Sequence, residues 1–579
     1  MSTSVLILGG GTMQLPAIQT ALSRKWTVSV ADGNPDAPGA GLCHHFIHVD
    51  LRDLDGLIEA AGRIKDSYGL DGVFTAGTDF SFAVAKIAEA HDLPGMSPET
   101  AKGASDKVRM RRIFAQKGVP APSFVQILPE EGVRERTREL SFPLVVKPVD
   151  NMGSRGVRRV ETCVELEEAA EEARRSSFSG NVIVEEYIDG SEFSIDALVE
   201  GGEIRITGFA DRIIRFSPYF VEMGHTLPSV VEPSLQEAVE STFKRAVSAL
   251  GITEGAAKGD VKWNGKEAVV GEVAARLSGG YMSGWTFPYA TGVDLTGAAL
   301  NISVGLPAGN LDPVVKRVSA ERAFISIPGT VAALEGRDKA RAMSGVKELF
   351  VRVSPGEEVR FPTNNVEKCG NIIAVDESRE RACQRAEKAA RQVWVRLEPE
   401  EEITERFLYK KEEGWIEDAF TLNVPENYRY YKEMEPLKIL HGSPFSRGTG
   451  KYDGSKSKGV GFVSAENGPE ILVYPLPKLH LENTLDWHGT SLAQSAERAL
   501  SHTSARFIEG EDGENSLRTG TVILGSVFWT ALLRGGLQGA VWCVETVRRI
   551  VERGEDPCAW GERIEVPECS GIVPNREPG

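Results

Sequence analysis

The chain has few cysteines, no excess of basic charge and no long hydrophobic run. Its 7 cysteines among 579 residues are scattered without paired spacing, which argues against a disulfide framework or a zinc cluster. With 66 Lys and Arg against 83 Asp and Glu, the net charge of -17 argues against nucleic acid and anionic membranes as partners. The longest apolar run, residues 521–533, stops short of the roughly 18 residues that a membrane-spanning helix needs and is expected to form a buried helix or strand. The first residues resemble no signal peptide, so a cytoplasmic location is expected.

What is present is ordinary globular composition arranged as alternating strands and helices. The length predicts three or four folding units, and 41% hydrophobic residues can build sizeable cores. Residues 5–8 form an apolar run that ends in Gly9, Gly10 and Gly11, a helical pattern follows, and residues 27–30 supply the next strand. This order predicts a parallel sheet with flanking helices. The third glycine of a dinucleotide fingerprint is missing, so nicotinamide binding is disfavoured.

The segment from residue 142 to residue 157 carries the first chemical signal. Lys147 stands at the end of an apolar strand, where a lysine is costly unless an anion meets it. The polar turn that follows, residues 150–157, holds two glycines and can offer several backbone N–H groups to phosphate oxygens. A plain hairpin is the alternative interpretation of this loop, and the Walker pattern of P-loop proteins is absent.

Acidic residues in two predicted hairpins add a second signal. Glu185 and Glu192 flank a glycine turn, and residues 257–262 and 269–276 form another hairpin with Asp260 and Glu272 near the strand centres. Adjacent carboxylates repel unless cations lie between them, and oxygen ligands of this kind suit Mg²⁺ held with substrate phosphates. An exposed strand carboxylate is the alternative for each acid taken alone.

Together, residues 5–399 resemble the ATP-grasp superfamily in residue types, order and spacing. The resemblance implies an α/β fold with a Rossmann-like pre-ATP-grasp domain, ATP-grasp α+β lobes and a carboxy-terminal lobe, with ATP and Mg²⁺ (or Mn²⁺) as cofactors. It implies Asp260 and Glu272 as metal ligands, and Arg276 and Lys147 as catalytic residues. His225, in the segment of residues 223–228, is a further catalytic candidate that could contact the substrate or act on the incoming ammonium. For His225 and Arg276, a turn histidine and a structural salt bridge remain the alternatives. The residues implied to contact the nucleotide are Lys107, Lys147, Ser154, Gly156, Val157, Glu185, Glu186, Tyr187, Ile188 and Glu192.

The branch of the superfamily is suggested by residues 272–280. They resemble the Glu-x-Ala-Ala-Arg-x-x-Gly segment of amino-acid ligases, in which a carboxylate attacks ATP, an acyl phosphate forms and an amine displaces the phosphate. Ala274 stands where many members carry an asparagine, which leaves a second Mg²⁺ one ligand poorer. The expected partners are thus a small carboxylate and an amine, and a homodimer is left open. The alternatives are a biotin carboxylase-like or purine-biosynthesis-like carboxylating enzyme, or a non-catalytic ATP-binding regulatory protein.

The expected division places a Rossmann-like domain at 1–95, an ATP-grasp domain at 96–310 and its carboxy-terminal lobe at 311–400. A charge-rich linker or solvated helix at 401–425 and an extra α+β domain at 426–579 would follow. The extra domain resembles no family. Its glycine- and lysine-rich loop, residues 448–454, could embrace an anion, but a mobile surface loop is the favoured interpretation.

Overall fold

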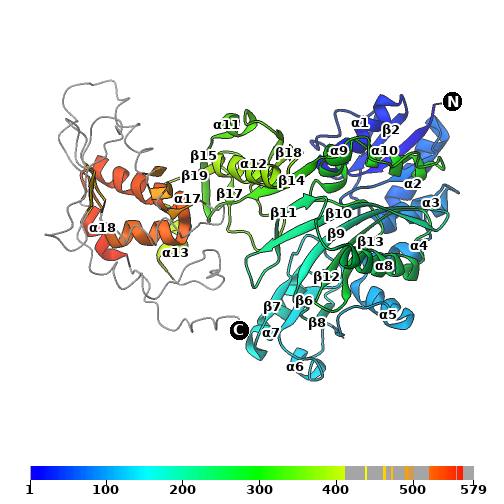
Figure 1. Ribbon diagram of the computed structural model, residues 1–579, viewed down its shortest axis with the longest axis horizontal. Coiled ribbons are helices and arrows are strands. Elements are labelled where there is room, and N and C mark those ends of the chain that lie inside the picture. Colours follow the sequence, from blue (N-terminus) through cyan, green and yellow to red (C-terminus); the bar gives the residue numbers. More distant parts are fainter. Residues whose placement is uncertain are drawn as a thin grey trace.

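The computed structural model describes residues 2–410, 437–439, 461–463, 471–473, 490–499 apart from 493 and 497, 521–523, 525–555 and 557–564. The molecule is elongated, with the amino-terminal unit at one end and helix α17 (Gly525–Glu552) at the other (Figure 1). The mixed α/β fold expected from the sequence is confirmed. Within the described ranges, no helix is both long enough and apolar enough to cross a membrane.

The first unit is a parallel sheet with strand order β3-β2-β1-β4. Side chains alternate across β1, so that Val5 and Ile7 enter one apolar core while Leu6 and Leu8 enter another on the opposite face. The predicted order of strand, glycine turn, helix and strand is confirmed. The elements are β1 (Ser4–Leu8), η1 (Thr12–Gln14), α1 (Leu15–Ser23), β2 (Thr27–Asp32), β3 (His45–His48), α2 (Leu54–Tyr68), β4 (Gly72–Phe74) and α3 (Ser81–Ala90).

A small antiparallel sheet follows, with strand order β5-β8-β6-β7. Before it, the Asp106 side chain accepts a hydrogen bond from the Arg109 N–H at 2.9 Å, which caps a helix that begins at Lys107 and ends at the left-handed Gly118. The cap places Lys107 at the helix terminus that faces the small sheet. The elements are α4 (Pro98–Ser105), α5 (Lys107–Lys117), β5 (Phe124–Ile127), α6 (Val133–Arg136), β6 (Leu144–Pro148), β7 (Arg158–Val160), α7 (Cys163–Ser176) and β8 (Val182–Glu186).

The centre of the molecule is an eight-stranded sheet with the order β13-β12-β9-β10-β11-β14-β18-β16. Strands from the segment expected as a carboxy-terminal lobe continue the same sheet, and α10 returns to pack on the first unit. The strands are β9 (Ser191–Glu200), β10 (Glu203–Arg215), β11 (Val221–Leu227), β12 (Gly255–Trp263), β13 (Ala268–Ala274), β14 (Val318–Phe324), β16 (Val346–Val351) and β18 (Gly370–Asp376). The helices are α8 (Pro233–Leu250), η2 (Met282–Thr286), α9 (Phe287–Thr291) and α10 (Leu295–Ser303).

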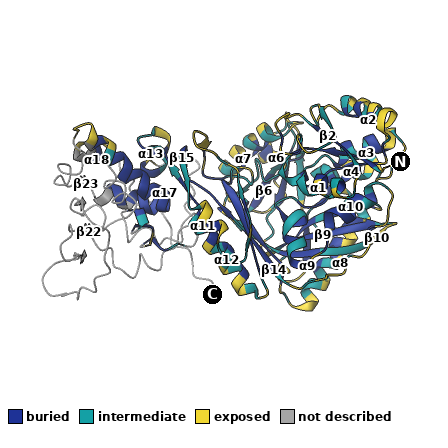
Figure 2. Ribbon diagram, turned by 90° about the horizontal axis from the view of Figure 1, so that it is seen from above, coloured by how far each residue is buried: buried dark blue, intermediate teal, exposed yellow. Residues whose placement is uncertain are grey.

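The carboxy-terminal elements share one apolar core with a three-stranded sheet of order β17-β15-β19. In the stretch expected as a linker or solvated helix, α13 is a helix that packs Leu408 and Tyr409 against α17, and residues 411–425 of that stretch lie outside the described residues. Most of α17 is buried (Figure 2). The expectation of a buried helix or strand at residues 521–533 is confirmed for residues 527, 528 and 530–533, which are buried in α17, whereas the loop at 448–454 lies outside the described residues. The elements are β15 (Gly329–Glu335), α11 (Arg337–Arg341), β17 (Glu358–Val359), α12 (Arg379–Gln392), β19 (Trp394–Leu397), α13 (Glu402–Tyr409), β20 (Leu437–Ile439), β21 (Gly461–Val463), β22 (Ile471–Val473), β23 (Thr521–Ile523) and α18 (Pro557–Arg563).

Candidate active site

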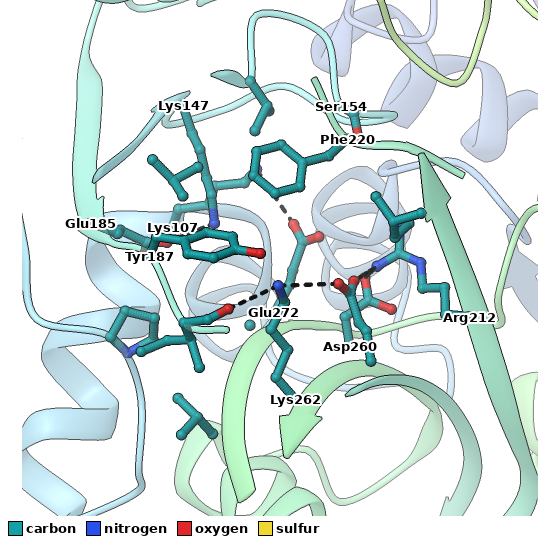
Figure 3. Close-up of a pocket in the computed structure, with 18 of the residues that line it drawn as sticks. Lys107, Lys147, Ser154, Glu185, Tyr187, Arg212, Phe220, Asp260, Lys262 and Glu272 are labelled. Atoms are coloured by element: carbon teal, nitrogen blue, oxygen red, sulfur yellow. Dashed lines mark hydrogen bonds and ion pairs between the residues drawn. The ribbon is translucent and has the colours of Figure 1, made fainter. Parts of the chain in front are cut away.

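A cavity lies between the small antiparallel sheet and the β9, β10, β12 and β13 part of the large sheet (Figure 3). One wall comes from β6, β8 and the loop of residues 151–157, called the glycine loop below. The other wall comes from the hairpins β9–β10 and β12–β13. Segments far apart in the sequence therefore face one space. The residues singled out from the sequence that line it are Lys107, Lys147, Ser154, Val157, Glu185, Glu186, Tyr187, Ile188, Glu192, Asp260 and Glu272.

Gly156, Arg276 and His225 do not line this cavity. Gly156 instead shapes the loop, because its φ of 65° is left-handed and a Cβ there would lie 2.7 Å from the Ser176 Cβ. The backbone of this loop is held from outside by Asn365, whose N–H donates to the Gly153 carbonyl at 2.9 Å. The loop thus needs glycine for its course as well as for access to a ligand.

A buried chain of charges sets the position of Lys147. The Lys147 Nζ lies 2.6 Å from one oxygen of Glu185, and the Arg111 Nε lies 2.7 Å from the other. Burial opposes ionisation of Glu185, but Arg111 and Lys147 outweigh it and keep the pKa of this carboxyl below its ordinary value. The sequence predicted that an anion would lie beside Lys147. In this structure that anion is the Glu185 carboxylate, which holds the Lys147 ammonium at the cavity wall.

Sequence reasoning missed Arg111, whose side chain is only 1% exposed. Its guanidinium also donates to the Gly271 carbonyl at 2.6 Å, so it joins α5 to β8 and β13. The residue is one of several basic residues in α5, and nothing in the local pattern separates it from its exposed neighbours. Only the tertiary arrangement identifies it.

At the end of β8, fewer backbone N–H groups are free to bind a nucleotide base than the resemblance implied. The Glu186 N–H donates to the Ser123 carbonyl at 3.0 Å, and the Tyr187 N–H donates to the Pro143 carbonyl at 2.9 Å. The Tyr187 ring contacts the cations of Arg159 and Lys262, at 4.3 and 4.8 Å from its centroid. These two amides are engaged within the protein, and the Ile188 carbonyl accepts from the Lys262 Nζ at 3.0 Å, while Glu186, Tyr187 and Ile188 all line the cavity.

Asp260 and Glu272 are direct cross-strand partners in the hairpin of β12 and β13. Glu272 lies 3.4 Å from the Lys107 Nζ, and its side chain is 35% exposed. Burial opposes its ionisation, but Lys107, Lys258 and Lys147 outweigh it and lower the pKa of Glu272. Two carboxylates on one face supply the hard oxygen donors that Mg²⁺ prefers, so the pair fits a divalent cation shared with substrate phosphates.

Arg212 on β10 is a second residue that sequence reasoning missed. Its guanidinium reaches three acids, Glu192, Glu222 and Asp260, with N to O distances of 2.5, 2.8 and 3.0 Å. β10 also carries Asp211 and Arg215, so the signal of a lone charge on an apolar strand, which singled out Lys147, is absent here. In the structure, Arg212 fixes Glu192 and Asp260 relative to each other.

Arg276 lies two residues after the end of β13, the second strand of the acidic hairpin, and its side chain contacts the amino-terminal unit. Its Nη2 lies 2.7 Å from the Asp79 carboxylate. The segment after it is held by Asp196, which accepts hydrogen bonds from the Ser278 N–H, the Ser278 hydroxyl and the Ser283 hydroxyl at 3.1, 2.6 and 2.8 Å. Arg276 therefore marks the junction of the first sheet with the candidate site.

His225 lies on β11, buried between two carboxylates. Its Nε2 is 3.3 Å from Glu222 and its Nδ1 is 3.4 Å from Glu321. Burial disfavours the charged ring, but Glu222 and Glu321 outweigh burial and raise the pKa of His225 to about 9. The ring is therefore a cation at neutral pH, which suits it to fix carboxylates and not to accept a proton.

The cavity is not a simple positive pocket. Its lining holds the four basic residues Lys107, Lys147, Arg212 and Lys262 and the five acidic residues Glu185, Glu186, Glu192, Asp260 and Glu272. A polyphosphate entering such a lining meets as much repulsion as attraction, so added cations are needed to bring it close to the acids. This is an independent reason for a divalent cation to accompany a nucleotide here.

Residues 140–284 match the model of the ATP-grasp domain, and residues 323–398 match that of L-amino acid ligase C-terminal domain 2. An uncharacterized protein, y4rH, of Sinorhizobium fredii is 29% identical over 339 residues, which cover 58% of this chain and 70% of that protein. Alanine–anticapsin ligase of Bacillus subtilis is 25% identical over 262 residues, covering 41% of this chain and 54% of that protein.

The fold is also similar to a solved structure. L-amino acid ligase from Bacillus licheniformis superposes with a TM-score of 0.60 at 23% identity, covering 69% of this chain and 99% of that one. Both matched models fall within the segment predicted to resemble the superfamily. The chain therefore carries an ATP-grasp domain followed by an L-amino acid ligase C-terminal domain 2.

Proposed function

We propose that the protein is an ATP-dependent carboxylate–amine ligase that works through an acyl phosphate and releases ADP and phosphate. The observation that carries the proposal is the convergence of Lys107 and Lys147 with Asp260 and Glu272 on one cavity. Anion-binding amines and metal-binding carboxylates together are what phosphoryl transfer to a carboxylate requires. The substrates would be an amino acid or another small acid, and an amine.

In this proposal, the cavity binds ATP along its length. Tyr187 and Ile188 face the base, Glu192 faces the ribose, and Lys107 and Lys147 face the phosphates. Glu185 acts as a positioning residue, because both of its oxygens are engaged by cations and its carboxylate holds the Lys147 ammonium in place. The glycine loop, residues 151–157, covers the phosphates with its N–H groups.

Asp260 and Glu272 would hold Mg²⁺ or Mn²⁺, which neutralises charge on the transferring phosphoryl group. The substrate carboxylate attacks the γ-phosphorus, the bond to the bridging oxygen breaks and ADP leaves. The amine nitrogen then attacks the acyl carbon, the C–O bond to phosphate breaks, and a proton leaves the nitrogen as the amide forms. Arg276, as a forked cation beside the hairpin, would grip the acid or the acyl phosphate after exchanging its contact with Asp79.

The match to L-amino acid ligase C-terminal domain 2 at residues 323–398 supports the ligase over the carboxylating alternative. A direct test incubates the protein with ATP, Mg²⁺ and a panel of amino acids, singly and in pairs, and measures phosphate release together with the nucleotide product. Release of ADP that depends on particular pairs is expected.

Each other outcome counts against a stated part of the proposal. Production of AMP would refute the acyl phosphate. Release that requires bicarbonate would support the carboxylating enzyme instead. ATP binding without turnover across the whole panel would support the non-catalytic regulatory protein. A Glu272→Gln variant should show no release while keeping the native circular dichroism spectrum.

A further inference from the structure

Lys258 is a charged residue that the proposed reaction leaves unused. It lies on β12 two residues before Asp260, so both side chains project from the same face of the strand. Its Nζ forms an ion pair with the Asp260 Oδ2, and its side chain is only 13% exposed. The Lys258 ammonium therefore contacts the Asp260 carboxylate without lining the cavity.

The strand register explains why there is room for it. Lys258 is directly opposite Ala274, just as Asp260 is directly opposite Glu272. These four side chains occupy one face of the hairpin as two adjacent cross-strand pairs. Ala274 presents a methyl group with no oxygen, so the long side chain of Lys258 passes beside it to reach Asp260.

The two carboxylates are not equivalent as metal ligands. Asp260 already meets three donors, because the Ser194 hydroxyl at 3.2 Å and the Arg212 Nη1 at 3.0 Å join Lys258 on it. Among the described residues, Glu272 forms one direct ion pair, with Lys107 at 3.4 Å, and it keeps the larger exposed fraction. Mg²⁺ takes about six oxygen ligands, so a second ion at this hairpin would have to displace the donors on Asp260 and would find none at position 274.

We propose that the Lys258 ammonium is a fixed cation that takes the place of a second divalent metal ion, so that the nucleotide complex of this protein binds one metal ion, held mainly by Glu272 and the phosphates. The inference rests on the proposed ATP-binding function of the same site. It assigns to Lys258 a positioning role: it neutralises and anchors Asp260, which in turn orients Arg212 and the ribose-facing Glu192.

The stoichiometry of bound metal tests the inference without turnover. Free Mn²⁺ is followed by electron paramagnetic resonance while it is titrated into the native protein saturated with β,γ-imido-ATP. One Mn²⁺ per chain is expected. Two ions bound with similar affinity would refute the role of Lys258 while leaving the ligase proposal standing. Failure of the native protein to bind the nucleotide analogue would refute the ligase proposal and this inference together.

A set of variants tests whether Lys258 and Ala274 limit the protein to one bound metal ion. In the double variant Lys258→Met/Ala274→Asn, loss of the ammonium frees Asp260 and the amide supplies an oxygen, so the stoichiometry should rise from one to two Mn²⁺. Ala274→Asn alone and Lys258→Arg should stay at one, because both keep a cation on Asp260. A double variant that folds, by its thermal melt, and still binds one ion would overturn the inference, as would a second ion in Lys258→Arg.

Discussion

Replacing His225 by glutamine should make the stability of the protein respond to pH in a defined window. His225 is buried between Glu222 and Glu321, and its pKa in the folded state is about 9 against an ordinary value of 6.5. A group whose pKa is raised on folding stabilises the folded state fully below its unfolded pKa and loses that contribution as pH rises through its folded pKa. The window therefore runs from about pH 6.5 to about pH 9.

The magnitude follows from the same two values. One unit of pKa corresponds to about 1.4 kcal/mol, so protonated His225 contributes up to about 3 kcal/mol to the free energy of unfolding. In the His225→Gln variant, Glu222 and Glu321 lose this cation at every pH. The difference between native and variant in the free energy of unfolding should thus be largest at pH 6.5 and smaller by about 3 kcal/mol at pH 9.5.

Urea unfolding followed by tryptophan fluorescence at several pH values measures this difference. His48→Gln is the matched control, since His48 is exposed and its ring forms a hydrogen bond with the Gly33 carbonyl, at 3.0 Å, and no ion pair with a described residue. The control should track the native protein across the range. A native-minus-variant difference for His225 that stays constant from pH 6.5 to 9.5 would show that the ring is not held as a cation between the two acids.

Three further outcomes test the charges around the cavity. Arg111→Met should lower the free energy of unfolding by about 3–5 kcal/mol, because it leaves Glu185 buried with one partner fewer. The control Arg109→Met breaks an exposed ion pair and should change this free energy by less than about 1 kcal/mol. Denaturant unfolding curves of the two variants make the comparison. Lys147→Met should weaken ATP binding by at least about tenfold in a calorimetric titration, and unchanged affinity would remove this residue from the phosphate site. Glu272→Gln should abolish Mn²⁺ binding in the nucleotide complex while nucleotide analogue binding persists at reduced affinity, and retained Mn²⁺ would place the metal elsewhere.

The parts of the site that the sequence could predict are those with local signals. Lys147 ends an apolar strand where a lysine is costly, the loop after it combines two glycines with polar residues, and Asp260 and Glu272 place carboxylates in neighbouring strands. The register confirms that the two acids are direct partners across the hairpin. Such local patterns depend on a few neighbouring residues, so they survive without knowledge of the tertiary fold.

The parts that the sequence could not predict are long-range pairings of charge. Arg276 meets Asp79, which is 197 positions away, and neither residue lies in a pattern that points to the other. Arg111 resembles the exposed arginines beside it until α5 packs against β8 and β13. Composition and periodicity describe which face of an element is apolar, but they do not describe which buried charges compensate one another.

The carboxy-terminal helices belong to the packing of the lobe that precedes them. Val331, Val395 and Leu397 of the three-stranded sheet share one core with Leu408 of α13 and Trp542 of α17. Polar contacts cross the same boundary, because the Trp542 indole N–H donates to the Glu398 carbonyl at 3.0 Å. Apolar surface of this kind is stable only when covered, so the sheet and the helices depend on each other for burial. Phe324 of β14 and Ile372 of β18 belong to the same core, and these strands continue the sheet that carries Asp260, so the carboxy-terminal helices pack on the sheet that holds the candidate active site.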